Sequence, residues 1–341
     1  MSEPTAKRAR LASDDGAATT SGQTSAGIIR SENFWLDDGN IILQAENTQF
    51  RVHKSMLARQ STIFKDMFSI PQPTKPLDPV IEGCPVVALS DKTSDVECML
   101  SIFYDNNNVV DLENALPIDQ LSAILSMGKK YEITYLRDRA LKRLRRCFPV
   151  TLKEWDDSFG DANGPSISFE PMVDTIESVI SLAHMHDISS ILPGAYLFYL
   201  SQASPEEILR GDKKVLSQDT REQCILGRDG LIRRIQLFVN MWGNGNKFMP
   251  PASCTNAGQC SFAKADVLEM LIISLWLRDE RTMWDLSPDI PPPASMIVSA
   301  LCDSCSASIK THYNKARERI WAELPKYFAL PDWEELKDFD A

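Results

Sequence analysis

Two runs, Asn40-Ile41-Ile42-Leu43-Gln44-Ala45 and Gln49-Phe50-Arg51-Val52, decide the fold of the first part of the chain. Both are short and rich in β-branched or aromatic side chains, and the polar Glu46-Asn47-Thr48 separates them, which predicts two strands joined by a turn. In residues 53–68, apolar side chains recur at helical spacing and predict two short helices. A strand pair that leads directly into helices is typical of an α+β fold.

The same mixture of short strands and helices continues along the chain. Val86-Val87-Ala88-Leu89 predicts a third strand, bounded by Pro85 and Ser90. Apolar faces within 121–128 and 136–148 predict two further helices. We therefore predict an α+β domain over residues 31–150.

The two flanks of this domain have different compositions. Residues 1–30 are rich in Ser, Thr, Ala and Gly, and such a segment buries too little apolar surface to offset its ordering entropy, so we expect a disordered tail. Beyond residue 150 the strand pattern gives way to helical faces, for example at 172–183 and 231–242. We expect an all-helical C-terminal domain over residues 151–341.

Two helices of this second domain carry more specific predictions. Val267 to Leu277 is apolar nearly all round, which predicts a central buried helix. The last helix is predicted to run from about Ser295 to Leu324, where Pro325 stops it because proline cannot donate a helical hydrogen bond.

The residues after the second predicted strand resemble a known family. Phe50-Arg51-Val52-His53-Lys54, Leu57-Ala58, Ser61 and Phe64 stand in the order and spacing of a BTB/POZ domain. The run 34–149 resembles the fungal, basidiomycete-type branch of that family, through the motifs Cys84-Pro85-Val86-Val87-Ala88-Leu89 and Gly128-Lys129-Lys130-Tyr131. More weakly, Trp321-Ala322-Glu323-Leu324-Pro325 and Leu330-Pro331-Asp332-Trp333 resemble the tail of the same fungal proteins.

The resemblance implies a small sheet with helices that binds other proteins, often a second copy of itself, and has no active site. Some relatives hold substrates for cullin ubiquitin ligases, and others act in transcriptional regulation. The leading interpretation is therefore a non-catalytic adaptor or scaffold, with a nuclear transcriptional co-regulator as the alternative. Expected partners are proteins, either itself or a cullin, with no direct nucleic-acid contact and no membrane.

The resemblance also implies a charged pocket in many BTB homodimers, where an Asp at the start of the first strand meets a basic residue after the His. Here the basic residue is Lys54, but the acidic position holds Asn40, which cannot form the same ion pair. Asp37 or Asp38 is left to reach Lys54, while His53 is expected to pack against the fold and cap the helix start. We predict an interaction surface from these five residues and leave its use for homodimerisation open.

Four cysteines form the candidate metal site. Cys254 and Cys260 lie in a Gly/Pro/Asn-rich stretch that we expect to be a loop, and Cys302 and Cys305 form a C-x-x-C whose members share one helix face. Zinc prefers four soft ligands in two close pairs, so a structural zinc ion is one interpretation. Buried free thiols are the second, because cysteine is a common core residue, and a redox pair is a third. No other cofactor is expected.

Bulk composition limits the remaining classes of function. The net charge of -11 argues against extensive nucleic-acid binding, because phosphate recognition needs a positive surface. With neither a secretory signal nor an apolar stretch long enough to span a bilayer, we expect an intracellular protein, in the nucleus or cytoplasm, with reduced cysteines. Lys7-Arg8-Ala9-Arg10 is either a nuclear-import signal or a solvated charge run.

Other charged and titratable residues have plainer interpretations. No hydrolase or metalloprotease motif is present, and we predict that the chain is not an enzyme. His184 and His186 lie two apart on a predicted helix and are expected to be structural. A basic helix is expected to be a solvated face or a docking site for an acidic partner, and its cationic residues are Arg137, Arg139, Lys142, Arg143, Arg145 and Arg146.

Overall fold

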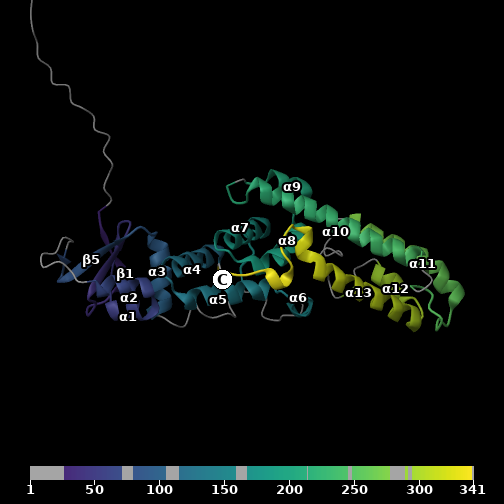
Figure 1. The fold of residues 1–341 in the computed structure, drawn as a ribbon, viewed down its shortest axis with the longest axis horizontal. Helices are drawn as coiled ribbons and strands as arrows, with labels where there is room; N and C mark the ends of the chain where they lie inside the picture. The colour runs from purple at the N-terminus through teal and green to yellow at the C-terminus, as the bar shows by residue number, and fades with distance from the viewer. Residues whose placement is uncertain are drawn as a thin grey trace, which may run out of the picture.

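The protein is elongated, with a small sheet at one end and long helices at the other, as Figure 1 shows. The computed structural model describes residues 27–70, 80–104, 115–158, 167–212, 214–244, 248–276, 289–290 and 294–339. The basic cluster Lys7–Arg10 and all but the last few residues of the predicted tail lie outside these ranges. Within these ranges, the helices are too short or too polar to cross a membrane.

Five strands form the sheet, in the order β1-β3-β2-β5-β4. Their bounds are β1 Ile29–Trp35, β2 Ile41–Ala45, β3 Thr48–Val52, β4 Val80–Ile81 and β5 Cys84–Leu89. β2 and β3 pair antiparallel from Ile41↔Val52 to Ala45↔Thr48, and β2 pairs in parallel with β5. The predicted hairpin is confirmed, and the predicted third strand forms part of β5, which begins two residues earlier and includes Pro85.

Helices pack against this sheet and complete the N-terminal part of the chain. They are α1 Lys54–Gln60, α2 Thr62–Ser69, α3 Thr93–Tyr104, α4 Ile118–Lys130 and α5 Thr134–Cys147. Phe64 of α2 stacks on Tyr131 with ring centroids 4.6 Å apart, and the Ser61 hydroxyl donates a hydrogen bond to the Tyr131 carbonyl at 2.6 Å. These contacts fasten the first two helices to the end of α4.

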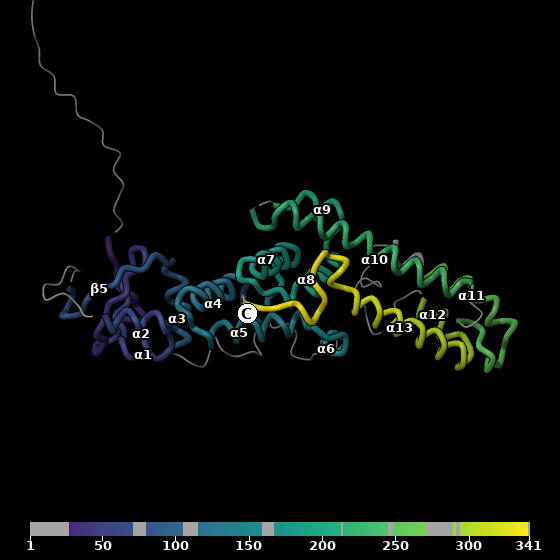
Figure 2. Tube along the Cα trace, in the orientation of Figure 1, coloured from purple at the N-terminus to yellow at the C-terminus, as the bar shows by residue number. Residues whose placement is uncertain are grey.

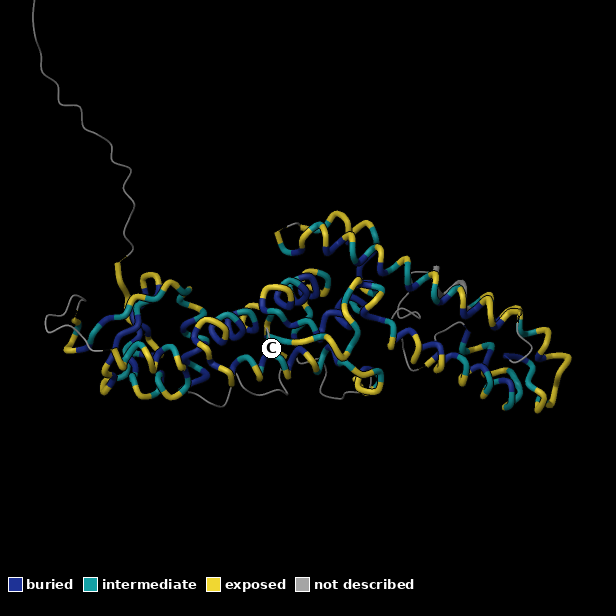
Figure 3. Tube along the Cα trace, in the orientation of Figure 1, coloured by how far each residue is buried: buried dark blue, intermediate teal, exposed yellow. Residues whose placement is uncertain are grey.

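The rest of the described chain is helical, apart from isolated bridges, so the predicted fold class is confirmed. Its elements are α6 Leu152–Ser158, α7 Met172–Met185, η1 Ser189–Ile191, α8 Leu192–Gln202, α9 Pro205–Arg210, α10 Gln218–Asn244, α11 Ala257–Trp276, α12 Ala294–Ser299, α13 Asp303–Tyr327 and η3 Trp333–Glu335. The main hydrophobic core runs on from the sheet into these helices. Figure 3 shows this as buried segments that follow the sheet and the inward faces of the helices.

Aromatic packing carries the core across residue 150. Phe148 meets Phe169 and Phe198 with centroids 6.1 Å away in each case. A backbone bridge between Leu116 and Ile167 adds a second link. The helical part is therefore built onto the N-terminal part by a shared core.

The predicted last helix is wrong in two respects. The chain forms two helices there, α12 and α13, and Pro325 lies inside the last turn of α13 rather than ending it. Proline has no N–H, so the Trp321 carbonyl one turn earlier loses its helical donor. The Trp333 indole N–H donates to that carbonyl instead, at 2.8 Å, and the two indole rings stack at 5.4 Å. A residue from the following tail thus satisfies the carbonyl that proline leaves open.

The predicted buried helix at Val267 to Leu277 falls in α11 up to Trp276, and Leu277 lies outside the described residues. The residues of this helix whose burial is described are not buried all round. Val267 is fully buried, Leu268 is half-buried and Glu269 is exposed. Earlier in α11, Phe262 is 81% exposed. This part of α11 therefore has one face toward α10 and another toward solvent.

The chain's own C-terminal segment contacts the basic helix α5. Figure 2 shows the segment leaving the end of α13 and running back beside α5. Arg145 pairs with Asp338 at 2.7 Å, and Arg137 stacks over the Phe339 ring with 4.2 Å to its centroid. Asp338 also accepts hydrogen bonds from the backbone and hydroxyl of Ser190. At Arg145 the acidic partner is therefore intramolecular, whereas Arg137 contacts an aromatic ring of the same segment.

Two neighbouring histidines, the exposed His184 and the buried His186, predict how stability depends on pH. Desolvation lowers the pKa of His184 and of His186, and Lys129 lowers that of His186 further against the opposing effect of Asp187. Both ring nitrogens of His186 are buried without a hydrogen-bond partner among the described residues. An unfolded histidine titrates at about pH 6.5. Because both pKa values are lower in the folded state, the unfolded state binds more protons than the folded state as the pH falls through this range. The free energy of unfolding should therefore fall as the pH drops from about 7 to about 5.5.

Urea unfolding at several pH values measures this dependence. His186→Leu removes one of the two titrating groups and should give a shallower slope than the wild type. An unchanged slope in that variant would contradict the assignment of the pH dependence to His186.

Candidate functional site

The start of α1 lies beside the start of β2 and brings together the residues predicted to form an interaction surface. The side-chain oxygen of Asn40 accepts a hydrogen bond from the backbone N–H of Lys54 at 2.8 Å. That N–H is one of the donors that the first turn of a helix leaves without an internal partner. Asn40 therefore stabilises the beginning of α1. This hydrogen bond uses only the backbone of Lys54 and does not involve its ammonium group.

His53 occupies the N-cap position of α1, but its side chain does not cap the helix, so that prediction is wrong. Its Nδ1 lies 3.1 Å from the Tyr104 hydroxyl, and its Nε2 lies 3.1 Å from Asp38. Asp38 thus reaches His53 rather than Lys54. Asp37 is exposed, and within the described part of the chain neither carboxylate pairs with Lys54.

Tyr104 is a member of this site that the sequence did not indicate. It lies 51 residues after His53, at the end of α3, and its hydroxyl accepts the backbone N–H of His53 at 3.0 Å. Burial raises the pKa of Tyr104, which keeps the hydroxyl protonated at neutral pH. No local pattern around residue 104 could have predicted this contact, because it depends on how α3 packs beside α1.

Lys54 lies over an aromatic ring on a partly apolar surface. Its ammonium nitrogen is 5.9 Å from the centroid of Phe68, close enough for a cation–π attraction. The same two helices leave Met56 and Met67 half-exposed. We call Lys54, Met56, Met67 and Phe68 the α1–α2 surface.

The β1 edge of the sheet is a second exposed feature nearby. β1 pairs in parallel with β3 on one side only, and Ile29 at its start is 60% exposed. Arg30 carries charge along this edge and pairs with Glu82 at 2.5 Å. Charged side chains on an edge strand limit nonspecific pairing while leaving backbone groups open to a chosen partner.

Comparison with known proteins identifies this part of the chain. Residues 37–146 match the BTB/POZ domain family. This segment is a BTB/POZ domain. No curated protein matches the chain, and assignment to the fungal branch stays a prediction.

The BTB/POZ match gives the α1–α2 surface a functional context. BTB/POZ domains are protein–protein interaction modules, generally without catalytic activity, and they mediate homodimerisation. The match begins at Asp37 and ends at residue 146, so it includes β2 to β5 and nearly all of α5. It leaves out all of β1 and the helical region from α6 onward.

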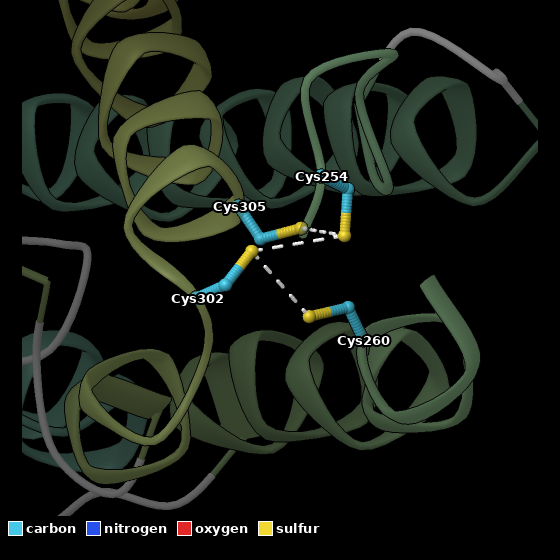
Figure 4. A group of neighbouring side chains, drawn as sticks. All are labelled: Cys254, Cys260, Cys302 and Cys305. Atoms are coloured by element: carbon cyan, nitrogen blue, oxygen red, sulfur yellow. Dashed lines mark hydrogen bonds between the residues drawn. The ribbon is translucent and has the colours of Figure 1, made fainter. Parts of the chain in front are cut away.

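The four candidate metal-ligating cysteines lie together at the far end of the helical region. Cys254 comes from the segment before α11, and Cys302 and Cys305 come from the start of α13. Cys260 lies in the first turn of α11, so the predicted loop holds only Cys254. Figure 4 shows all four sulfur atoms directed toward one centre. The four sulfurs lie within 4.8 Å of one another.

Backbone N–H groups surround one of these sulfurs. Cys302 is the N-cap residue of α13, and its sulfur accepts hydrogen bonds from the backbone of Cys305 and of Thr255, which lower the pKa of its thiol to about 5. Burial raises the pKa of Cys305, which lies deeper in the core. A Cys302 thiolate is the favoured form at neutral pH.

Proposed function

We propose that the chain is a non-catalytic adaptor or scaffold whose BTB/POZ domain binds a second copy of the chain through the α1–α2 surface. The observation that carries this proposal is the position of Lys54 beside half-exposed apolar side chains in a domain whose family mediates homodimerisation. Burial of those side chains against a partner removes apolar area from water, which is the main favourable term in protein association.

Lys54 supplies the polar part of the proposed interface. Asn40 hydrogen-bonds to its backbone, Asp38 contacts His53, and no carboxylate of the described chain pairs with the ammonium. The charge is therefore available to an acceptor on the partner. A reversed charge at this position would place a carboxylate against the same partner surface and over the electron-rich face of Phe68.

The helical region gives the proposed scaffold its second surface. Because the hydrophobic core runs from the sheet into the helices, we propose that this region is held in a fixed orientation against the BTB/POZ domain. Dimerisation at one end would then present two copies of the helical region to other proteins. This is the sense in which the chain would act as a scaffold.

Size-exclusion chromatography with light scattering on the full chain tests self-association. We expect a mass near twice the chain mass of 38.3 kDa. Lys54→Glu should shift the equilibrium to the monomer, because it removes the cation from the proposed interface and introduces an opposite charge.

Lys142→Glu is the matched control, since it makes the same charge change on α5, away from the α1–α2 surface. It should leave the dimer intact. A wild-type monomer at all concentrations would exclude self-association, and a dimer that survives Lys54→Glu would place the interface elsewhere.

A cullin ligase is the proposed partner in the adaptor form of this function. Its test is co-elution of the purified chain with a purified cullin N-terminal domain. A dimer that does not bind the cullin would retain the scaffold and exclude this adaptor role. The nuclear co-regulator alternative depends on Lys7, Arg8 and Arg10. Nuclear and cytoplasmic fractionation of a variant in which all three are substituted tests it.

A further inference from the structure

The cysteine cluster joins two parts of the helical region that are far apart in sequence. Cys260 and Cys302 are 42 residues apart, yet their sulfurs lie 3.7 Å from each other. Cys254 contacts Cys302 at 3.7 Å and Cys305 at 3.5 Å. Each of the two segments contributes a close pair of thiols, and the two pairs face one another (Figure 4).

We propose that Cys254, Cys260, Cys302 and Cys305 bind a single structural zinc ion as four thiolate ligands. Zinc in a four-cysteine site is tetrahedral with metal–sulfur bonds of about 2.3 Å, which places the sulfurs about 3.8 Å apart. The three sulfur–sulfur distances of 3.5–3.7 Å are close to that value. Every pair of the four sulfur atoms lies within 4.8 Å. These short distances fit one central ion better than an iron–sulfur cluster, whose several atoms would hold the sulfurs farther apart.

The surroundings of the ligands suit a negatively charged metal–thiolate centre. Four thiolates around Zn²⁺ leave a net negative charge that needs hydrogen-bond donors. The backbone N–H groups of Thr255 and Cys305 point to the sulfur of Cys302, and that of Asn256 points to the sulfur of Cys254. These donors come from the segment before α11 and from the first turn of α13, where helical N–H groups have no internal partner.

Two competing explanations account for the cluster less well. A disulfide places its sulfurs about 2.05 Å apart, far below the closest distance of 3.5 Å in the cluster. A purely apolar core would bury all four thiols, but Cys254 and Cys302 are only half-buried while Cys260 and Cys305 are fully buried. The other free cysteines, Cys84, Cys98, Cys147 and Cys224, are not part of this group.

The bound ion would hold the start of α13 against the start of α11. The ion would join Cys260 to Cys302, which are 42 residues apart in the chain. A link that closes a long loop reduces the entropy of the unfolded chain. Because α13 packs on α10 and carries Trp321 toward the BTB/POZ side of the molecule, this link would fix the far end of the helical region. The proposal is independent of self-association through the α1–α2 surface.

Metal analysis of the full chain, purified without chelator, tests the proposal directly. Inductively coupled plasma mass spectrometry should find about one zinc ion per chain. Removal of the metal with a chelator should lower the midpoint of thermal unfolding, and added zinc should restore it. Cobalt substitution gives a second readout, because a tetrahedral Co²⁺–thiolate site has intense visible and near-ultraviolet absorption.

Cysteine substitutions locate the site. Cys254→Ser replaces a half-buried ligand and should lower bound zinc at least about tenfold, whereas Cys98→Ser, on α3, should leave it unchanged. If Cys254→Ser does not fold, the cobalt spectrum of the wild type still shows whether the four cysteines bind a tetrahedral metal ion. A folded, metal-free chain that gives no cobalt–thiolate spectrum, or a site filled with iron, would overturn the assignment, as would a disulfide among these cysteines found by mass spectrometry under non-reducing conditions.

Discussion

Replacing Glu177 by alanine should lower the free energy of unfolding by about 3–5 kcal/mol, because it leaves the buried guanidinium of Arg221 without its counter-charge. Arg221 lies on α10 and Glu177 on α7, and the side chains are 0% and 6% exposed. Two parallel hydrogen bonds join them, from Nη1 to Oε1 at 2.7 Å and from Nη2 to Oε2 at 2.8 Å. Bidentate pairs of this kind are the strongest side-chain hydrogen bonds.

The rest of the guanidinium environment cannot replace the lost carboxylate. Arg221 also donates to the carbonyl oxygens of Ile208, Asp212 and Leu216, all of which are neutral acceptors. The Tyr199 hydroxyl donates to Glu177, and its pKa is raised by burial first and then by this carboxylate. Loss of Glu177 would therefore leave a charged group and a phenol with unsatisfied hydrogen-bonding capacity in the core.

Urea unfolding of Glu177→Ala and Glu206→Ala measures the effect against a matched control. Glu206 pairs with Arg210 at 2.6 Å, but both side chains are more than two-thirds exposed, so its removal should cost less than about 1 kcal/mol. A double variant, Glu177→Leu with Arg221→Met, should be more stable than Glu177→Ala because it removes the uncompensated charge. Equal costs for the buried and exposed pairs would contradict the argument.

The sequence predicted those elements of the fold that depend on local pattern. The β2–β3 hairpin was recognisable because β-branched and aromatic side chains flank a polar turn, and Glu46 in that turn adopts a positive φ of 51°. β1 was missed because most of its residues are polar or charged and only Ser31 and Phe34 are buried. α3 was missed as well, although Val96, Met99, Leu100 and Phe103 give it a buried face.

Contacts between distant segments were not predictable from local pattern. The C-x-x-C spacing indicated that Cys302 and Cys305 share a face, and the preference of zinc for two close pairs suggested Cys254 and Cys260 as the other two ligands. No local pattern showed that the two pairs meet in the fold. Arg221 and Glu177 are 44 residues apart and carry no motif. The error at Pro325 has the same origin, because the donor that satisfies the Trp321 carbonyl comes from Trp333, in the segment after α13.

Gly227→Ala should destabilise the protein by about 1–3 kcal/mol, although alanine favours a helix by about 1 kcal/mol over glycine. A Cβ atom at this position of α10 would overlap Cδ1 and Cε1 of the Phe328 ring and lie 3.0 Å from the Tyr327 carbonyl oxygen. The ring has little room to move, because Phe328 is fully buried and packs against Tyr196 with centroids 4.9 Å apart. The substitution would therefore push the end of α13 away from α10.

Gly243→Ala in the same helix separates this steric cost from the helix preference of alanine. A Cβ atom there would meet only Leu268 Cδ1, at an ordinary contact distance of 3.5 Å. This variant should be neutral or more stable than the wild type by up to about 1 kcal/mol. Thermal or urea unfolding of both variants should thus give changes of opposite sign, since the two substitutions differ in what the new methyl group meets. If Gly227→Ala were as stable as Gly243→Ala, the close approach of Phe328 to α10 would be wrong, and with it the tight junction between α13 and α10 that anchors the C-terminal segment.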